Sequence, residues 1–342
     1  MSHPTHTSFI TSRLALASVA AVVLLVAPAQ RTATAADRMA HAAVAPDDEQ
    51  NRTQTDRDTK VLTLGANGTL ELKNISGDIV VTGGSGREVR VEITRRSRGR
   101  TDDDARLGLQ RVTVKVEQKG DRATVAAEYP RDERRNAYSV DVAYTVTAPA
   151  GLHIDANSVS GDVRVENMKS DVAAHSVSGN VVVSGAGGMT EVRSISGNVT
   201  LTGASGDIAT LGTVSGDVTI DRVAARQIQA ETTSGDVRAT GVDAERASMR
   251  SLSGSVVYAG AVAKAGRYEL QTHSGNVSFA PTGTAGYELD ATTFSGTITP
   301  PRGMAAERVS GRAARLFHGT IGSGGASVSI TTFSGDITVG AR

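Results

Sequence analysis

One short motif recurs through this chain at a nearly fixed interval: a Ser-Gly pair, then a small polar residue, then an aliphatic residue. Aligned on the glycine, the copies from Gly161 to Gly296 are 18 to 21 residues apart. Such a period is typical of solenoids, in which each repeat stacks on its neighbours. We expect the glycines to form the corners of stacked rungs, because glycine accepts positive φ and close backbone approach. They are Gly161, Gly179, Gly197, Gly216, Gly235, Gly254, Gly275, Gly296 and Gly335, with an early copy at Gly77 and a weaker one at Gly319.

Apolar residues flank every corner with the period of two that strands have. Two residues after the glycine, the column begins with Ile79 and Val163 and stays aliphatic in every copy. Seven and five residues before it lie pairs such as Ile154 and Ala156, which we expect to face the core. The residue two before the glycine is mostly apolar too, but it lies an odd number of residues from the other apolar positions of its strand. We therefore expect the chain to turn or bulge there, with the apolar residues on both sides of the glycine forming the walls of the corner. This second set is Val159, Val177, Ile195, Val214, Leu252, Phe294 and Phe333.

Two polar columns accompany the corner. Ser or Thr stands three residues before nearly every glycine, as in Ser176 and Thr213, and Asp, Asn, Ser or Thr follows directly after it. Short polar side chains of this kind bond to backbone groups in turns, and stacked copies can bond to each other. We therefore expect hydroxyl and Asx ladders. Outward positions between the corners are polar but unlike one another, as in His175 and Arg193, so no stripe of one chemistry is predicted.

These patterns predict an all-β fold, a parallel β-solenoid (β-helix) of about 18–21 residues per rung, which we expect to be right-handed. Period-two runs within 61–150 predict antiparallel strands, with a hairpin turn at 118–122, and this region is expected to cap the N-terminal end. The solenoid repeats are assigned to 151–342. The irregular stretch 300–325 is expected to help close the other end.

The first residues have the layout of a secretory signal peptide. Arg13 precedes an apolar run from Leu14 to Ala29, which is shorter than the roughly 20 residues of a spanning helix. We expect residues 1–36 to be a signal peptide that is cleaved, which leaves no stable membrane span. The protein is then expected to be secreted, periplasmic or at the cell surface. An uncleaved N-terminal anchor is the alternative. Residues 37–60 lack apolar periodicity and are predicted to be a disordered linker.

The composition excludes several classes of function. Lys and Arg together number 36, as do Asp and Glu, so the formal net charge is zero and no nucleic-acid partner is expected. Trp is absent and aromatic residues make up 3%, which argues against broad platforms for stacking sugars or bases. Cys is absent, which excludes disulfides and thiolate metal sites. The basic cluster 94–100, followed by Asp102, Asp103 and Asp104, is interpreted as a solvated loop.

The strongest chemical candidate is a pair of acids in the Asx column. Asp217 and Asp236 are expected one rung apart and could share a hard cation such as Ca²⁺. Two carboxylates ~5 Å apart in water repel by only about 1 kcal/mol, so a role as turn residues is preferred and no metal site is predicted. His175 is expected to be solvated, and His273 to be a core or corner substitution. We predict no catalytic residues, no cofactor and no enzyme activity.

With its Ser-Gly-Asp/Asn-Val column, its entry GTLELKNISGDIVVTG (68–83) and its closing ASVSITTFSGDITV (326–339), the sequence resembles the bacterial putative-adhesin family of β-strand-repeat proteins (head-GIN-like) over roughly 61–339. The resemblance implies a surface or periplasmic scaffold and offers no catalytic residues. We predict an exported, non-enzymatic solenoid that gives a rigid surface for contact with an envelope protein or glycan. Two alternatives stay open: a carbohydrate-active β-helix that binds or cleaves polysaccharide, and an envelope stress or regulatory protein, which rests on family analogy alone.

Overall fold

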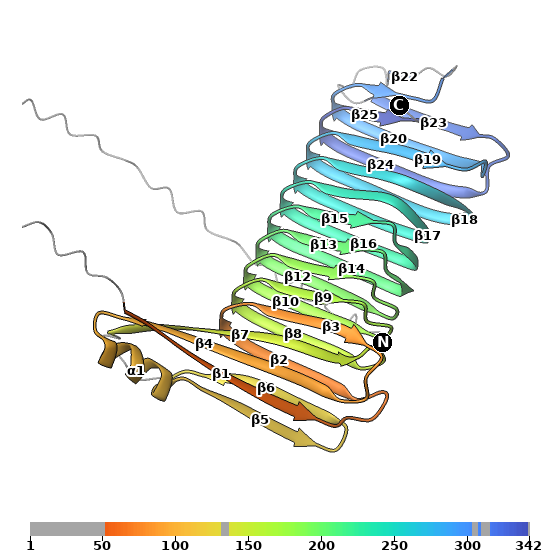
Figure 1. Ribbon diagram of the computed structural model, residues 1–342. Helices are drawn as coiled ribbons and strands as arrows, with labels where there is room; N and C mark the ends of the chain where they lie inside the picture. The colour runs from red at the N-terminus through yellow and green to blue at the C-terminus, as the bar shows by residue number, and fades with distance from the viewer. Residues whose placement is uncertain (1–51, 131–136, 303–306, 309–314, 341–342) are drawn as a thin grey trace, which may run out of the picture. The chain divides into compact units, whose positions relative to one another are not determined.

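The strands of this protein stack rung upon rung, and each rung contributes one strand before the corner glycine and one after it (Figure 1). Val181 pairs with both Val163 and Val199, and Val199 pairs in turn with Val218, all between parallel strands. The predicted stack of valines is therefore confirmed. The structure, a computed structural model, describes residues 52–130, 137–302, 307–308 and 315–340, so the predicted signal peptide lies outside the described residues.

Two series of parallel strands make up the stack. Before the corner, the order in space is β2 (Thr69–Ser76), β8 (His153–Ser160), β10 (Val172–Ser178), β12 (Thr190–Ser196), β14 (Ser205–Ser215) and β16 (Ala224–Ser234). After the corner it is β3 (Ile79–Gly84), β9 (Val163–Glu166), β11 (Val181–Ser184), β13 (Val199–Thr202) and β15 (Val218–Asp221). β17 (Val237–Ser253) and β18 (Val256–Ser274) each run from one corner to the next and so belong to both series; β19 (Val277–Thr282) follows β18 after its corner.

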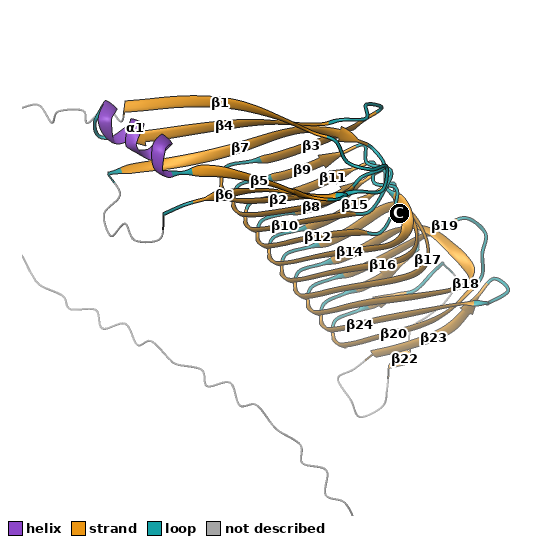
Figure 2. Cartoon of the chain, turned by 90° about the horizontal axis from the view of Figure 1, so that it is seen from below, coloured by secondary structure: helices purple, strands orange, loops and turns teal. Residues whose placement is uncertain are grey.

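The C-terminal rungs do not stack in chain order. β24 (Ala326–Ser334) lies between β18 and β20 (Tyr287–Ser295) and pairs in parallel with both (Figure 2). In the same way, β25 (Ile337–Val339) lies between β19 and β21 (Ile298–Thr299). The chain therefore builds its last rung first and then returns to fill the rung before it. The order of the rungs in space therefore differs at this end from the order of the repeats in the sequence.

An antiparallel strand closes the C-terminal end of the stack. β23 (Arg315–Ile321) pairs antiparallel with β20, and β22 (Glu307–Arg308) pairs antiparallel with β23. Gly319, the predicted weak corner, lies inside β23 opposite Leu289 and turns no corner. Because this strand runs against the direction of the rungs, it ends the parallel series, as expected for the stretch around 300–325.

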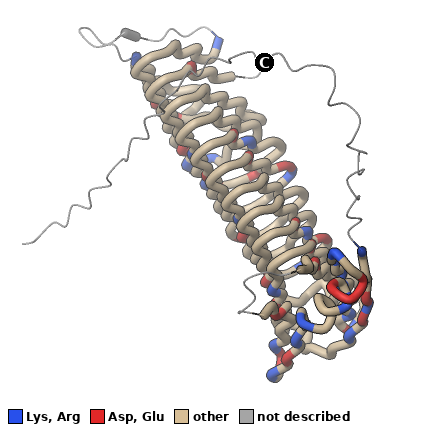
Figure 3. The backbone as a smooth tube through the Cα atoms, turned by 90° about the vertical axis from the view of Figure 1, so that its left-hand side faces the viewer, with Lys and Arg blue, Asp and Glu red and all other residues tan. Residues whose placement is uncertain are grey.

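The N-terminal region extends both strand series instead of forming a separate domain. Beyond β3 lie β7 (Tyr138–Pro149), β4 (Val89–Gly99) and β1 (Arg52–Leu62), the last two in antiparallel pairing. Beyond β2 lie β6 (Arg122–Glu128) and β5 (Thr113–Lys119), which form the predicted hairpin at 118–122. Charged residues are denser in these strands than along the rungs (Figure 3).

The linker predicted over 37–60 is wrong for residues 52–60, because these form most of β1. β1 pairs with β4 over its whole length, from Arg52 opposite Gly99 to Leu62 opposite Val89. Most of its side chains are exposed, so the strand has no apolar period to detect, and backbone pairing to a neighbour decides its conformation. Residues 37–51 lie outside the described part of the chain.

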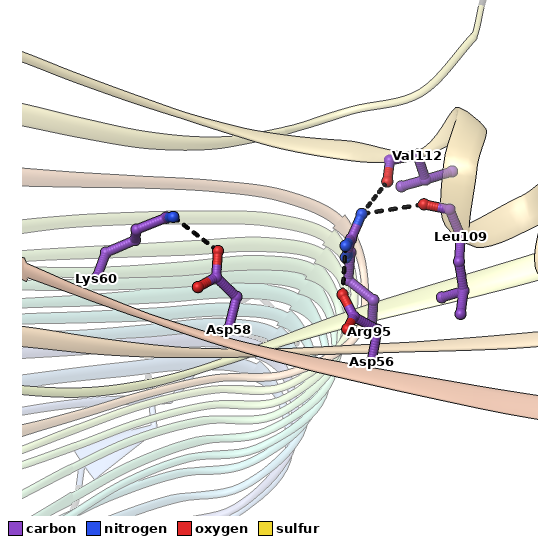
Figure 4. A network of polar contacts seen from close by, with 6 residues as sticks. All are labelled: Asp56, Asp58, Lys60, Arg95, Leu109 and Val112. Atoms are coloured by element: carbon purple, nitrogen blue, oxygen red, sulfur yellow. Dashed lines mark hydrogen bonds and ion pairs between the residues drawn. The ribbon is translucent and has the colours of Figure 1, made fainter.

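The solvated loop predicted around 94–104 is also wrong. Residues 94–99 belong to β4, and α1 (Asp102–Arg111) follows with a capping box, in which the Thr101 hydroxyl oxygen accepts the Asp104 N–H and the Asp104 carboxylate accepts the Thr101 N–H. Arg95 fixes the helix end by donating to the carbonyl oxygens of Leu109 and Val112, and it also pairs with Asp56 of β1 (Figure 4). In the described ranges, no helix has the length and apolarity that crossing a membrane requires.

The predicted inward columns form the core. Ile154, Ala156 and Val163 are at most 2% exposed. In the longer C-terminal rungs, Tyr258 stacks on Phe279 at 5.3 Å between ring centroids and meets Tyr268 edge-on at 5.4 Å. Longer rungs therefore enclose larger inward side chains, and aromatic packing replaces the aliphatic packing of the shorter ones.

The corner glycines approach one another more closely than any other residue type would allow. A Cβ atom on Gly179, Gly216 or Gly235 would lie closer than 3.0 Å to the carbonyl oxygen of the preceding corner glycine, and the same holds at the other corners after Gly77, where the close carbonyl is that of Val142. Gly216 and Gly235 also have φ values of 149° and 146°, which side chains disfavour. Close approach is thus the requirement that all corners share, and positive φ is added at most of them.

The substitution Gly235→Ala should therefore destabilise the stack. The methyl group would collide with the Gly216 carbonyl and the residue would keep a strained φ, which together cost about 2–4 kcal/mol and lower the thermal unfolding midpoint by roughly 5–10 °C. Gly86→Ala is the control, because a Cβ atom there meets nothing within 4 Å and φ is not positive. Equal midpoints for the two variants, measured by circular dichroism, would contradict the corner model.

Candidate functional site

The hydroxyl column at the corner ties each rung to the one before it. Ser194 Oγ donates to the Gly179 carbonyl oxygen at 2.9 Å, and Thr213 Oγ1 donates to that of Gly197 at 3.0 Å. These hydroxyls are buried, so each needs a hydrogen-bond partner within the protein, and the glycine carbonyl provides it. The same bond is made by Ser176, Thr232, Ser251, Thr272, Thr332 and Thr293.

The hydroxyl ladder fails at its first step for a specific reason. Asn74 takes the place of Ser or Thr in the first rung, and its Nδ2 donates to the Gly77 carbonyl oxygen at 2.8 Å. Ser158, which would otherwise donate to that oxygen, is buried and its Oγ has no hydrogen-bond partner among the described residues. Its hydroxyl therefore contributes nothing to the ladder.

The Asx ladder runs beside the hydroxyl column on the outside of the corner. The Asp236 N–H donates to Asp217 Oδ1 at 2.8 Å, and the Ser255 N–H donates to Asp236 Oδ1 at 2.8 Å. These backbone bonds account for the two acids that the sequence singled out for a cation. Within the described residues, no group of three or more His, Asp or Glu side chains is placed to hold a metal ion. The ladder also includes Asp78, Asp162, Asn180, Asn198, Asn276, Asp336 and Thr297.

The residues two before each corner glycine face solvent, which corrects the sequence interpretation. Val177, Ile195 and Leu252 are 41%, 50% and 54% exposed. Buried and exposed side chains alternate along the strand up to this position, and the change in which positions face the core occurs at the glycine itself. We call this set the corner column; in stacking order it is Ile75, Val159, Val177, Ile195, Val214, Thr233, Leu252, His273, Phe333 and Phe294.

The corner column becomes aromatic at its C-terminal end. His273 stacks on Phe333 with ring centroids 4.9 Å apart, and Phe333 stacks on Phe294 at the same distance, with interplanar angles of 8° and 5°. Phe333 therefore has a ring against each of its two faces, and His273 and Phe294 each have one face covered by it. The sequence left open whether His273 is a core or a corner substitution. Its exposed position in the corner column shows that it is a corner substitution.

A shallow groove follows the corner column. One part, of about 840 Å³, is lined by Val159, Val177, Ile195 and Val214, and a second part, of about 550 Å³, is lined by the residues from Leu252 onward. Glu231 lines both parts. The other wall is the set of residues four before each glycine, which we call the flanking column: Lys73, Asn157, His175, Arg193, Gly212, Glu231, Arg250, Gln271, Thr331 and Thr292.

Most charges of the flanking column are paired within the same face. Arg193 Nε lies 2.7 Å from Glu191 Oε1, and Arg250 Nη2 lies 2.8 Å from Glu269 Oε1. His175, expected to be solvated, is half-buried and contacts Glu191 through Nε2 at 3.6 Å. Among the described residues, Glu231 has no cationic partner. The groove thus has one apolar wall and one largely neutralised polar wall.

A hydrogen bond from Lys73, which lines the N-terminal end of the groove, lowers the pKa of Glu71 below its usual value, and a second bond from Thr124 adds to this. The ammonium and carboxylate are 2.6 Å apart. The Lys73 side chain is 53% exposed and that of Glu71 17% exposed, and the exposure of the ammonium limits what the pair adds to stability. Its consequence is that Lys73 presents a paired rather than a free charge to the groove.

Two serines of the hydroxyl column give a matched test of the ladder. Ser194→Ala should lower the free energy of unfolding by about 1–2 kcal/mol, because the Gly179 carbonyl loses its donor. Ser158→Ala removes an equally buried hydroxyl that has no partner, and should change stability by less than ~0.5 kcal/mol or increase it. Chemical denaturation of both variants measures the difference; equal losses would show that the ladder bonds carry no weight.

The Asx ladder should be sensitive to acid at its last step. Asp336 Oδ1 accepts the hydroxyl and the N–H of Thr297 at 2.7 and 2.8 Å, and these bonds lower its pKa below 3.8. Its stabilisation is therefore complete above pH 3.8 and is lost as the pH falls through the lower folded value. Asp336→Asn keeps an accepting oxygen and removes the titration. Amide exchange at Thr297 should accelerate on acidification in the wild type relative to this variant; identical pH profiles would refute the assignment.

Comparison with solved structures gives distant likenesses. A putative lipid-binding protein from Parabacteroides distasonis is 11% identical, with a TM-score of 0.48, and the match covers 84% of this chain and 97% of that one. A putative adhesin from Bacteroides fragilis is 12% identical with a TM-score of 0.38, covering 83% and 97%. A putative adhesin from Parabacteroides distasonis is 12% identical with a TM-score of 0.42, covering 83% and 96%. At these values none of them carries a ligand or an activity over to this chain.

No curated protein sequence matches this chain. A family model does: Toastrack DUF4097 matches residues 67–340, which include every described strand from β2 to β25 and leave out β1. The match agrees with the resemblance found on the Ser-Gly repeats and spans well over half of the sequence. The chain belongs to the Toastrack DUF4097 family.

Proposed function

We propose that this protein is an exported, non-enzymatic scaffold of the cell envelope or cell surface that binds a partner along its corner column. The observation that supports this most directly is the exposure of an apolar side chain on nearly every rung, in one line beside a groove. Contiguous exposed apolar surface on a folded protein commonly marks an interaction site.

The backbone under the corner column is held on every rung, so the surface is fixed before a partner arrives. The Gly179 N–H donates to the Ser196 carbonyl at 3.2 Å, and the Val181 N–H donates to the Asn198 carbonyl at 2.9 Å. The hydroxyl and Asx ladders add two bonds per rung at the same place. A preorganised surface loses little conformational freedom on binding, which favours affinity.

Export from the cytoplasm, periplasmic or surface location and a right-handed coil of 18–21 residues per rung are parts of this proposal that rest on the sequence. The layout of residues 1–36 supports export, and parallel strands joined by crossovers usually coil in the right-handed sense. A carbohydrate-active solenoid receives less support. Sugars bind to open aromatic faces, whereas the stack covers both faces of Phe333 and one face each of His273 and Phe294.

The proposal predicts that the protein binds to an envelope fraction of the bacterium that makes it, and that the corner column is required. The triple variant Val159→Ser, Val177→Ser and Val214→Ser should reduce co-sedimentation about tenfold or more, because three exposed apolar contacts are lost. The fold should persist, since these side chains lie outside the core.

The matched control changes three valines on the outward face of the strands after the corner: Val80→Ser, Val182→Ser and Val257→Ser. These alternate with buried residues as the corner valines do, but they are half-buried whereas the corner valines are exposed, so circular dichroism must show both triple variants folded before binding is compared. Binding should be unaffected. If both triple variants bind the envelope fraction as well as the wild type, the corner column is not the binding surface.

A further inference from the structure

We infer that the corner column is self-complementary and that its partner is a second copy of this chain, docked antiparallel about a two-fold axis near Val214 and Thr233. This inference rests on the proposed function, since it names the partner of the same surface. It would make the protein a homotypic scaffold whose copies associate along their corners.

The first argument is the repeat distance. Side chains of the corner column recur once per rung, at the ~4.8 Å spacing of hydrogen-bonded strands, and the centroids of His273, Phe333 and Phe294 lie 4.9 Å apart in succession. A partner must present apolar groups at the same interval to meet every rung at once. A helix or a loop does not have this repeat, whereas a second stack of the same chain has it by construction.

The second argument is the distribution of side-chain size. From Ile75 to Val214 the corner column is made of Val and Ile, and from Leu252 to Phe294 it is made of Leu, His and Phe. An antiparallel two-fold arrangement places the small half of each copy against the large half of the other. A parallel arrangement would place Phe against Phe at one end and Val against Val at the other, so the two surfaces would not meet evenly. Two-fold interfaces require self-complementarity of this kind.

In this antiparallel arrangement, each rung meets the rung at the same distance from the opposite end of the column. The resulting contacts between the copies are Ile75 with Phe294, Val159 with Phe333, Val177 with His273, Ile195 with Leu252, and Val214 with Thr233.

The third argument is area. Ten rungs rise about 43 Å, and the strip from the residue six before the glycine to the serine before it is about 16 Å wide, which gives roughly 700 Å² per copy. A standard specific interface buries about 800 Å² per partner. The strip is therefore large enough for a reversible dimer without the rest of the surface.

Sedimentation of the purified full chain over a concentration series tests the dimer. The wild type should form dimers, and the triple variant Val159→Ser, Val177→Ser and Val214→Ser should weaken the dimer about tenfold or more. The control triple Val80→Ser, Val182→Ser and Val257→Ser should dimerise as the wild type does. A wild type that stays monomeric, or a control triple that weakens the dimer as much, overturns the inference.

Single cysteines test the orientation, because the natural chain has none. With a short bismaleimide, Thr233→Cys should cross-link to itself near the axis, and Val159→Cys should cross-link to Phe333→Cys when the two proteins are mixed. Val159→Cys alone should stay uncross-linked. Self-cross-linking of Val159→Cys would indicate parallel docking, and the absence of cross-links at all positions would indicate another interface; either outcome overturns the inference.

The two proposals can fail separately. If the protein is monomeric but its co-sedimentation with the envelope fraction still depends on the corner valines, the corner column binds a different partner and the proposed function stands. If the protein dimerises through the corner column but binds no envelope component, the dimer stands and the envelope role fails.

Discussion

The close approach of successive corner glycines is the constraint on which the rest of the structure depends. Each corner packs its backbone against the carbonyl of the preceding glycine, at a distance that leaves no room for a Cβ atom. Once two strands meet at such a corner, the next rung can follow only in register, because a shift by one residue would place a side chain where the glycine must lie. The register set by the glycines also aligns the inward columns of Val, Leu and Ile.

The two polar ladders add hydrogen bonds between successive rungs to this steric constraint at the glycines. A buried hydroxyl such as Ser194 satisfies the glycine carbonyl of the preceding rung, and an Asx oxygen such as Asp217 accepts the backbone N–H of the next one. Both kinds of bond use short side chains that reach only neighbouring rungs. The energetic coupling is therefore local, as in other repeat proteins, and stability should grow with the number of rungs.

The same geometry produces the exposed corner column as a by-product of alternation. Two residues before the glycine the strand still points its side chain outward, so this position was free to take any polar residue without cost to the core. It is apolar or aromatic on nine rungs if His273 is counted, with Thr233 as the exception. The core does not require apolar side chains at this position, and their exposure is the observation behind the proposed binding role.

The sequence by itself determined the corner glycines, the inward columns, both polar ladders and the family, because each of these follows from a short motif repeated at one period. Only the tertiary structure decided where the corner valines point, because the sequence pattern near a glycine does not distinguish an apolar side chain that faces the core from one that faces solvent. It also decided that β1 is a strand, because pairing with β4 rather than an apolar period holds it. The insertion of β24 between β18 and β20 was decided in space as well, because the two last copies share the run Thr-Thr-Phe-Ser-Gly and either could occupy either rung.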